Sequence, residues 1–167
     1  MLTPTVFTLV DIAFGANRAD DVRRHGWPVH LDSPAVLATA AGRILLADRL
    51  DVAERLRSRP LPRFTRQTLT SWRGIERELQ AVRDTGTAIE HEELRAGFSC
   101  VATGLRDPGG TLIGTIGVCG RTNSFAPGRL AGLLHAAAKD ITRMLTTHHD
   151  ARQPRLQPQA HPPGVSH

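Results

Sequence analysis

Residues 86–119 read GTAIEHEELRAGFSCVATGLRDPGGTLIGTIGVC, and this stretch decides the fold. It contains two runs rich in β-branched and apolar residues, 99–105 and 111–119, joined by the linker Asp-Pro-Gly-Gly. Glycines supply the positive φ that tight turns require, so we predict two antiparallel strands in a hairpin. Residues 87–92 predict a third strand just before them.

Two amphipathic helices are expected on either side of these strands. In the first, Trp72, Ile75, Leu79 and Val82 recur at helical spacing, with Thr70 or Ser71 to cap its start and Gly86 to end it. The second covers residues 127–145. Its expected buried side comprises Leu130, Leu134, Ala137, Ile141 and Met144 or Leu145.

Nearer the N-terminus, Asp32, Ser33 and Pro34 resemble a helix start, and alanine and leucine dominate residues 35–46, where we predict a helix. Residues 51–57 predict a second, short helix. The segments 6–14 and 27–31 are candidate strands.

This mixture of strands and helices predicts an α+β fold, an antiparallel sheet flanked by helices. A chain of 167 residues fits one ordinary domain. We place that domain at 1–147 and expect a disordered tail over 148–167, which is rich in Pro, Gln, Arg and His.

The composition bounds the function. The net charge is +5, but the arginines are scattered along the chain and lack the aromatic partners of a nucleic-acid groove. No apolar run reaches the roughly 18 residues needed to span a membrane. Two cysteines and no export signal predict a cytoplasmic protein. The spacing of His and Cys matches no metal motif, and we expect neither a metal site nor a cofactor.

Cys100 and Cys119 are expected to face each other. If Gly109-Gly110 make a two-residue turn, residues whose numbers sum to 219 lie opposite across the hairpin, and 100 plus 119 is 219. Opposed residues have Cα atoms about 4.5–5.5 Å apart, near the range that a disulfide accepts. A reversible thiol pair is one interpretation, and two reduced thiols acting as small core residues is the favoured one.

Two stretches carry a resemblance to a known family. Residues 38–47, ATAAGRILLA, resemble the "HATAxGKxLLA" helix of the IclR family of bacterial transcription regulators. Residues 86–110 are similar to that family's "G…D-x-E-E…G-x-x-C-I-A-x-x-x-R-D-x-x-G" block. Together the resemblance covers roughly 27–145 and implies a GAF-like domain that binds a small metabolite, often a carboxylic acid.

The resemblance also implies the site. Carried over by position, an effector pocket is lined by Ala40, Ala41, Gly42, Glu90, Cys100, Gly117 and Cys119. Small residues at 40–42 leave room beside a helix, as an apolar ligand site requires. Glu90 is open to a second interpretation, a solvated charge at a strand end. Arg43 either pairs an anionic ligand or, as we favour, lies at the surface.

The sequence departs from the family pattern at several positions. The family's histidine before "ATA" is Leu37, its lysine is Arg43, its aspartate is Glu90, and its serines on the returning strand are Gly117 and Cys119. The family pattern also has a helix-turn-helix before the position of residue 6, and this sequence shows none. We therefore expect the chain alone not to bind DNA specifically.

These features predict an effector-sensing domain that is not an enzyme and that assembles as a homodimer or tetramer. Two other classes stay open. One is a free-standing interaction protein that titrates full-length IclR-type subunits. The other is a GAF-like thiol redox enzyme, although most such enzymes need a third cysteine.

Overall fold

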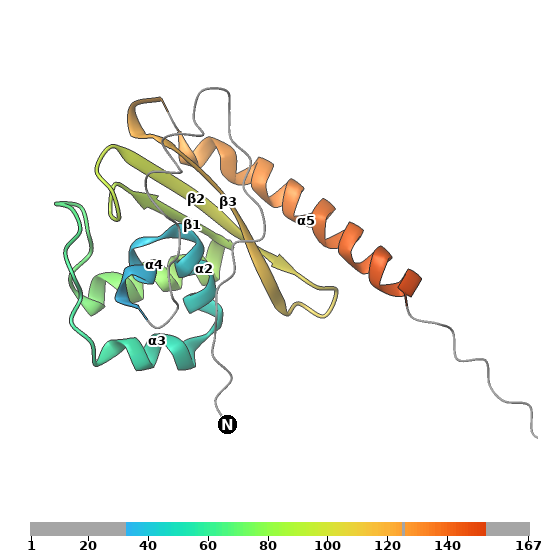
Figure 1. Cartoon of the computed structure of the whole chain (residues 1–167), viewed down its shortest axis with the longest axis horizontal. Helices are drawn as coiled ribbons and strands as arrows, with labels where there is room; N and C mark the ends of the chain where they lie inside the picture. Colours follow the sequence, from blue (N-terminus) through green and yellow to red (C-terminus); the bar gives the residue numbers. More distant parts are fainter. Residues whose placement is uncertain (1–32, 125, 153–167) are drawn as a thin grey trace, which may run out of the picture.

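The structure, a computed structural model, describes residues 33–124 and 126–152. The candidate strands at 6–14 and 27–31 lie outside the described residues. In chain order the elements are η1 (Pro34–Ala38), α2 (Ala40–Asp48), α3 (Leu50–Arg57), α4 (Trp72–Thr85), β1 (Thr87–His91), β2 (Phe98–Arg106), β3 (Leu112–Arg121), η2 (Thr122–Ser124) and α5 (Pro127–Arg152) (Figure 1). The strands form one antiparallel sheet in the order β1-β2-β3, which confirms the predicted α+β class.

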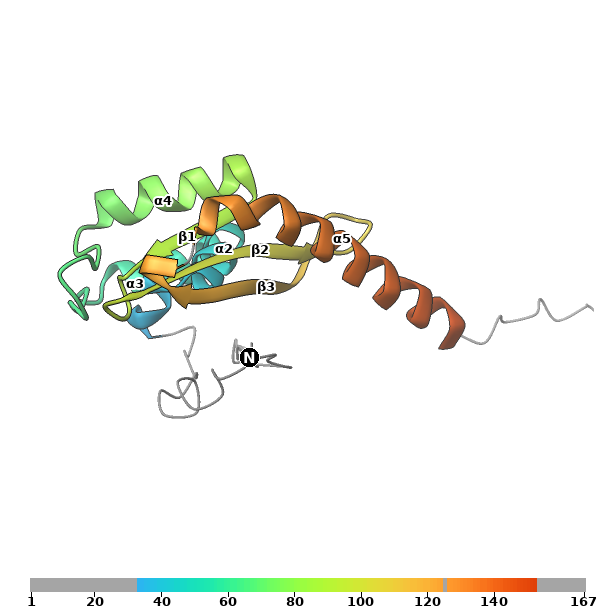
Figure 2. The ribbon, with the colours of Figure 1, turned by 90° about the horizontal axis from the view of Figure 1, so that it is seen from above.

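The two faces of the sheet meet different helices, because successive side chains of a strand point to opposite faces. Ala88 of β1 and Ala102 of β2 are opposed and join the core cluster formed by α2, α3 and α4. Their neighbours Thr87 and Thr103 are hydrogen-bonded to the ring of His135 in α5, at 2.8 and 3.2 Å. Helix α5 therefore covers the face opposite α2, and its later turns extend past the sheet (Figure 2).

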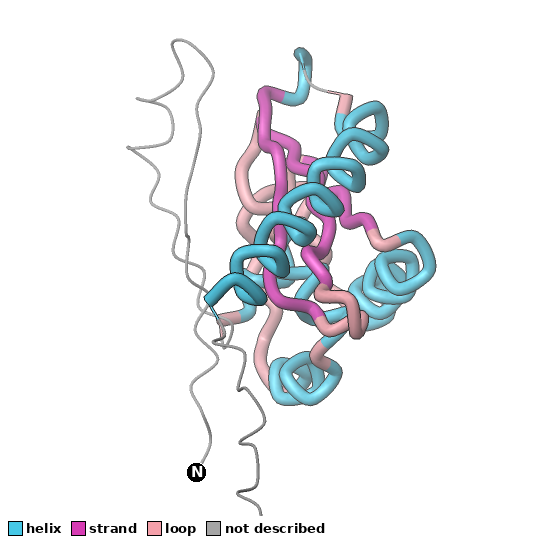
Figure 3. The backbone as a smooth tube through the Cα atoms, turned by 90° about the vertical axis from the view of Figure 1, so that its right-hand side faces the viewer, coloured by secondary structure: helices cyan, strands magenta, loops and turns pink. Residues whose placement is uncertain are grey.

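The core lies between the sheet and the four helices that precede it in the chain. Its best-buried apolar side chains come from η1, α2, α3 and α4, and the strands run as one twisted layer beside these helices (Figure 3). They include Val36, Ile44, Leu46, Leu56, Ile75 and Leu79. The predicted stripe of α4 is confirmed, since Ile75, Leu79 and Val82 are buried while Trp72 is half-buried.

Both predicted caps of α4 are also confirmed. The Ser71 side chain accepts a hydrogen bond from the amide of Gly74, which satisfies a free donor in the first turn. Gly86 ends the helix with a left-handed φ of 70°, a conformation that costs glycine little.

The single helix predicted over 35–46 is wrong, because Thr39 interrupts it in an extended conformation. Ser33 and Pro34 do start η1 as expected. The Thr39 hydroxyl then donates to the carbonyl of Val36 and accepts from the amide of Gly42, which caps α2. At Gly42 a Cβ atom would lie only 2.2 Å from the Val36 carbonyl oxygen, so glycine permits this close turn.

The hairpin has the predicted register but a different turn. Cys100 does lie opposite Cys119. The turn, however, is closed by Asp107 and Thr111, with a hydrogen bond from the Gly110 amide to the Asp107 carbonyl. This loop is one residue longer than the predicted one, and a bulge near Leu105 and Arg106 restores the register.

Helix α5 confirms the predicted last helix and continues to Arg152, beyond the expected boundary at 147. Leu134 and Ala138 are buried, and Leu130, Ala137 and Ile141 are half-buried. Met144 and Leu145, expected on the buried side, are 56% and 50% exposed because the sheet ends before this part of the helix.

Gly42→Ala is expected to destabilise the domain by about 1–3 kcal/mol, because the new methyl group must push the Val36 carbonyl away. Gly132→Ala in α5 is the matched control. Its Cβ would meet nothing within 4 Å, and the better helix former should add up to about 1 kcal/mol. Urea unfolding followed by circular dichroism measures both changes, and an unchanged midpoint for Gly42→Ala would contradict the close approach.

Candidate effector site

Arg43 organises the region that was predicted to bind an effector. Its side chain is 1% exposed, so the surface position we favoured is wrong. Its Nε donates to the carbonyl of Leu37 at 2.9 Å and its Nη1 to the carbonyl of Ile89 at 3.2 Å. Its Nη2 donates to the Glu93 carboxylate at 2.5 Å. Every nitrogen of the guanidinium thus has a partner within the chain, and Arg43 is not a free anchor for a ligand.

Glu93 is the partner that makes the buried charge tolerable. It is 7% exposed, and the carboxylate oxygen that pairs with Arg43 also accepts the amide of Leu69. The Glu93 carbonyl accepts the hydroxyl of Thr68 at 2.6 Å, and the neighbouring Glu92 carbonyl accepts that of Thr65, also at 2.6 Å. These bonds fasten the loop before α4 to the β1–β2 connection. Glu93 is the last residue of the D-x-E-E part of the family block, but nothing in the sequence indicated its pairing with Arg43.

Glu90 is buried at the end of β1, 3% exposed, so its interpretation as a solvated charge is wrong. Its Oε1 accepts hydrogen bonds from the backbone amides of Glu93 and Leu94. Burial raises the pKa of Glu90 to about 7, while the two amides and the more distant Arg43 pull it down and Glu93 pushes it up. Glu90 is therefore a carboxyl group poised between its two protonation states near neutral pH.

Glu90, Cys100 and Cys119 form one row across the three strands. The sheet register pairs Glu90 with Cys100, and Cys100 with Cys119. Since opposed residues share a face, all three point to the α2 side of the sheet. Cys100 and Cys119 are joined by a disulfide with Cα atoms 4.2 Å apart, in place of the two reduced thiols that we favoured.

The next row on this face holds Ala88, Ala102 and Gly117. Gly117 and Cys119 of β3 are exposed, and a Cβ at Gly117 would lie 3.0 Å from the Val101 carbonyl oxygen. Four of the seven predicted residues, Glu90, Cys100, Gly117 and Cys119, therefore share one sheet face.

The other three predicted residues form the first turn of α2, which packs against all three strands. Ala40 is 2% exposed and belongs to the core cluster, with Ala41 and Cys100 packed against that cluster. The tight contact at Gly42 gives this residue a packing role of its own. The turn thus bounds the sheet face with small side chains.

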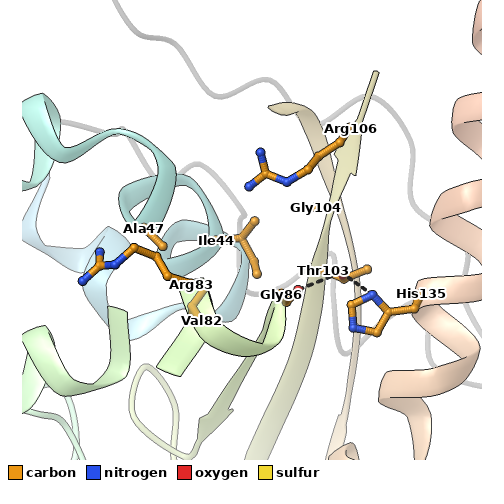
Figure 4. Close-up of a pocket in the computed structure, with 9 residues that line it drawn as sticks. All are labelled: Ile44, Ala47, Val82, Arg83, Gly86, Thr103, Gly104, Arg106 and His135. Carbon is orange, nitrogen blue, oxygen red and sulfur yellow. Dashed lines mark hydrogen bonds between the residues drawn. The ribbon is translucent and has the colours of Figure 1, made fainter. Parts of the chain in front are cut away.

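A separate pocket of about 400 Å³ opens beside β2, where the sheet extends past the start of β1 (Figure 4). It is lined by Ile44, Ala47, Val82, Arg83, Gly86, Thr103, Gly104, Arg106 and His135, and none of the seven predicted residues is among these. Arg106 already donates to Asp48 and to the Gly110 carbonyl, and His135 is bonded to Thr87 and Thr103. Sequence reasoning had no signal for this pocket, because distant segments meet there.

Among the described residues, no group of three or more His, Cys, Asp or Glu side chains is placed to hold a metal ion. In the same part of the chain, no helix is long and apolar enough to cross a membrane.

Residues 33–143 match the family model described as "Bacterial transcriptional regulator IclR C-terminal". The chain belongs to the IclR family. The match covers most of the described residues and agrees with the resemblance placed at 27–145, so this is an effector-binding domain of the type found in IclR regulators.

Two curated relatives show how much of an IclR regulator the chain represents. It is 32% identical to the HTH-type transcriptional regulator KdgR of Escherichia coli over 116 residues, which cover 66% of this chain and 44% of KdgR. It is 32% identical to BhcR of Paracoccus denitrificans over 122 residues, covering 70% of this chain and 44% of BhcR. The chain thus spans less than half the length of these relatives.

Solved structures agree with the IclR assignment. The C-terminal domain of E. coli KdgR is 31% identical with a TM-score of 0.58, and the match covers 66% of this chain and 70% of that one. Thermotoga maritima IclR is 28% identical with a TM-score of 0.60, covering 72% and 49%. The inducer-binding domain of PobR from Acinetobacter, a double mutant in complex with 3-hydroxybenzoic acid, is 26% identical with a TM-score of 0.58, covering 64% and 65%.

Arg43→Met is expected to cost about 3–5 kcal/mol of unfolding free energy, because it leaves the buried Glu93 carboxylate unpaired. Arg55→Met is the matched control. Arg55 pairs with Asp51 on the exposed face of α3, and its loss should cost no more than about 1 kcal/mol. Urea unfolding measures the free energy of unfolding of both variants. Equal losses of unfolding free energy would show that the buried pair stabilises the fold no more than the exposed one.

Glu90→Gln should flatten the pH dependence of stability. The pKa of Glu90 is raised in the folded protein, so the folded state holds a proton that the unfolded state has lost between pH 4.5 and about 7. Stability therefore falls as the pH rises through this window. Glutamine keeps the acceptor oxygen and cannot ionise, so the variant should match the parent near pH 4.5 and exceed it at pH 8 by up to about 3 kcal/mol.

The control for this pH profile is Glu92→Gln. The Gly97 amide, bonded to the Glu92 carboxylate, lowers the pKa of that group, so its substitution should lower stability at neutral pH. Thermal melts from pH 4 to 8 decide the question. A Glu90→Gln profile that keeps the slope of the parent would contradict the raised pKa.

Proposed function

We propose that this domain senses a small organic acid or similar metabolite at the sheet face formed by Glu90, Cys100, Gly117 and Cys119 and bounded by the Ala40–Asp48 helix. The observation that carries the proposal is the buried, poised carboxyl of Glu90 within a domain of the IclR effector-binding type. The inducer-bound PobR domain supports it, because a domain of similar fold binds a small aromatic acid.

The chemistry of the site suits such a ligand. Both backbone amides that bond to Glu90 use Oε1, and we assign Oε2 as the oxygen that meets the ligand. A protonated Glu90 donates a hydrogen bond to a ligand carboxylate, which would otherwise be repelled by the charged form. Binding of an anion is thus coupled to proton uptake, and the small, at least partly exposed residues Ala41, Gly117 and Cys119 border the site where the ligand's apolar part would lie.

We further propose that the domain works in the cytoplasm as a homodimer or tetramer, and that the ligand acts by shifting populations of the assembly. Helix α5 supports self-association, because Leu133, Met144 and Leu145 are 67%, 56% and 50% exposed. Exposed apolar side chains of this size gain stability when a second copy covers them. A full-length IclR-type subunit presents a comparable domain, so mixed assemblies are expected as well.

A thermal melt of the purified chain against a panel of small organic and aromatic acids tests the sensing proposal. A ligand at a hundredfold its dissociation constant adds about 2.7 kcal/mol to the unfolding free energy, which should raise the melting temperature by several degrees. Glu90→Leu removes this donor and should weaken binding of the same compound about tenfold, the loss of one hydrogen bond to a charged group. Glu90→Gln keeps a donor at that position and should bind the compound without the pH dependence of the parent.

The matched control separates the two candidate sites. Arg106→Gln alters the pocket beside β2 and should leave the shift unchanged. A compound whose shift is lost in Arg106→Gln and kept in Glu90→Leu would place the effector in that pocket instead. A panel that raises the melting temperature of neither the parent nor the variants would contradict the proposal.

A further inference from the structure

The cysteine pair lies in the candidate effector site and takes no part in the sensing chemistry described above. Cys100 and Cys119 are the two cysteines of the chain, and the hairpin register brings them face to face beside Glu90. The pairing depends only on that register, so the thiols stay opposed whether or not a bond joins them. Proteins in a reducing compartment usually keep such bonds transient and use them for redox sensing or catalysis.

The two sulfurs differ in their surroundings. Cys100 belongs to the central strand β2 and packs against the core cluster, half-buried. Cys119 belongs to β3, at one edge of the described sheet, and is exposed. Thiol–disulfide exchange requires access to the attacking sulfur. A soluble reagent therefore reaches Cys119 first, and Cys100 is placed to react with whatever forms on Cys119.

We propose that Cys100 and Cys119 form a redox-active dithiol oxidised by low-molecular-weight disulfides, in which Cys119 is the attacking thiol and Cys100 the resolving thiol. The Cys119 thiolate attacks one sulfur of a disulfide RSSR, whose S–S bond breaks and releases RS⁻. The Cys100 thiolate then attacks the Cys119 sulfur and releases the second RS⁻. The protein gives up two electrons, RSSR becomes two RSH after proton uptake, and the new bond is Cys100–Cys119.

Oxidation changes the sheet face that the effector is proposed to meet, and this consequence rests on the proposed function. Two separate thiols offer weak S–H donors beside Glu90, whereas the disulfide offers none and draws the sulfurs together. We expect the dissociation constant of a bound acid to differ at least tenfold between the two forms. The site would then report both metabolite and redox state.

The test follows the loss of free thiols when the reduced full chain is incubated with oxidised glutathione. Aliquots are quenched by alkylation, and their intact mass is measured by mass spectrometry. The parent should lose both thiols with little adduct. Cys100→Ser should accumulate a mixed disulfide at Cys119, and Cys119→Ser should form one at least tenfold more slowly. Val118→Thr changes the neighbouring residue of β3 and is the matched control, expected to behave as the parent does.

A second measurement needs no cysteine variant. A short iodoacetamide pulse on the reduced parent, followed by peptide mapping, should label Cys119 at least tenfold faster than Cys100. Equal labelling, equal adduct formation in the two serine variants, or a parent that keeps both thiols in oxidised glutathione would each overturn the proposal. If no acid raises the melting temperature of either redox form, the sensing proposal fails. The order in which the two thiols react still tests the redox proposal in that case. An acid that binds both forms equally would refute the coupling alone.

Discussion

The buried guanidinium of Arg43 is the constraint on which the rest of this domain depends. Its donors reach η1, β1 and the β1–β2 connection in three directions, and its charge also lies 3.8 Å from the Glu78 carboxylate in α4. A planar group with donors on separate nitrogens suits this arrangement, whereas a lysine would present its donors from a single point. Because an unpaired buried charge is so costly, these pairings hold α2 in place against η1, β1, the β1–β2 connection and α4.

Two nearby acids lie in different surroundings with respect to Arg43. Glu93 is paired directly with Arg43, so its charge is compensated. Glu90 is three residues away, receives only backbone amides and a more distant attraction from Arg43, and is repelled by Glu93. Burial then dominates, and its pKa rises. The same short segment thus holds one acid in a direct ion pair with Arg43 and another whose pKa is raised to about 7 by burial.

Much of the fold was predictable from local patterns. The apolar stripe and caps of α4, the three strands and the pairing of Cys100 with Cys119 all follow from periodicity and turn residues that act within a few positions. One error was local, because Thr39 breaks the first predicted helix through side-chain hydrogen bonds to residues three positions away. Another arose where distant segments meet, because the acidic partner of Arg43 lies 50 positions away and Arg43 therefore looked like a surface residue.

The candidate site shows the same division. The resemblance to a family supplied its residues, and the structure brings Glu90, Cys100, Gly117 and Cys119 onto one face, but sequence alone could not show that Glu90 is buried or that Gly42 is needed for packing. The register that the cysteine argument reached was right although its turn was not, since a longer loop and a bulge offset each other. Register is the more robust inference, because slipping by one residue would turn every buried side chain of β2 to the wrong face.

The departures from the family pattern can be understood together at this face. With glycine and cysteine at 117 and 119, the returning strand offers no hydroxyl at these positions, so under the proposed function polar recognition would fall more heavily on Glu90. A carboxyl whose pKa is raised to about 7 can donate to an acid only while it holds its proton, so the proposed recognition would depend on pH. Position 119 carries a cysteine where the family pattern has a serine. This cysteine lies opposite Cys100 and is bonded to it, so a fixed hydrogen-bonding group is exchanged for one whose chemistry follows the redox state of the surroundings.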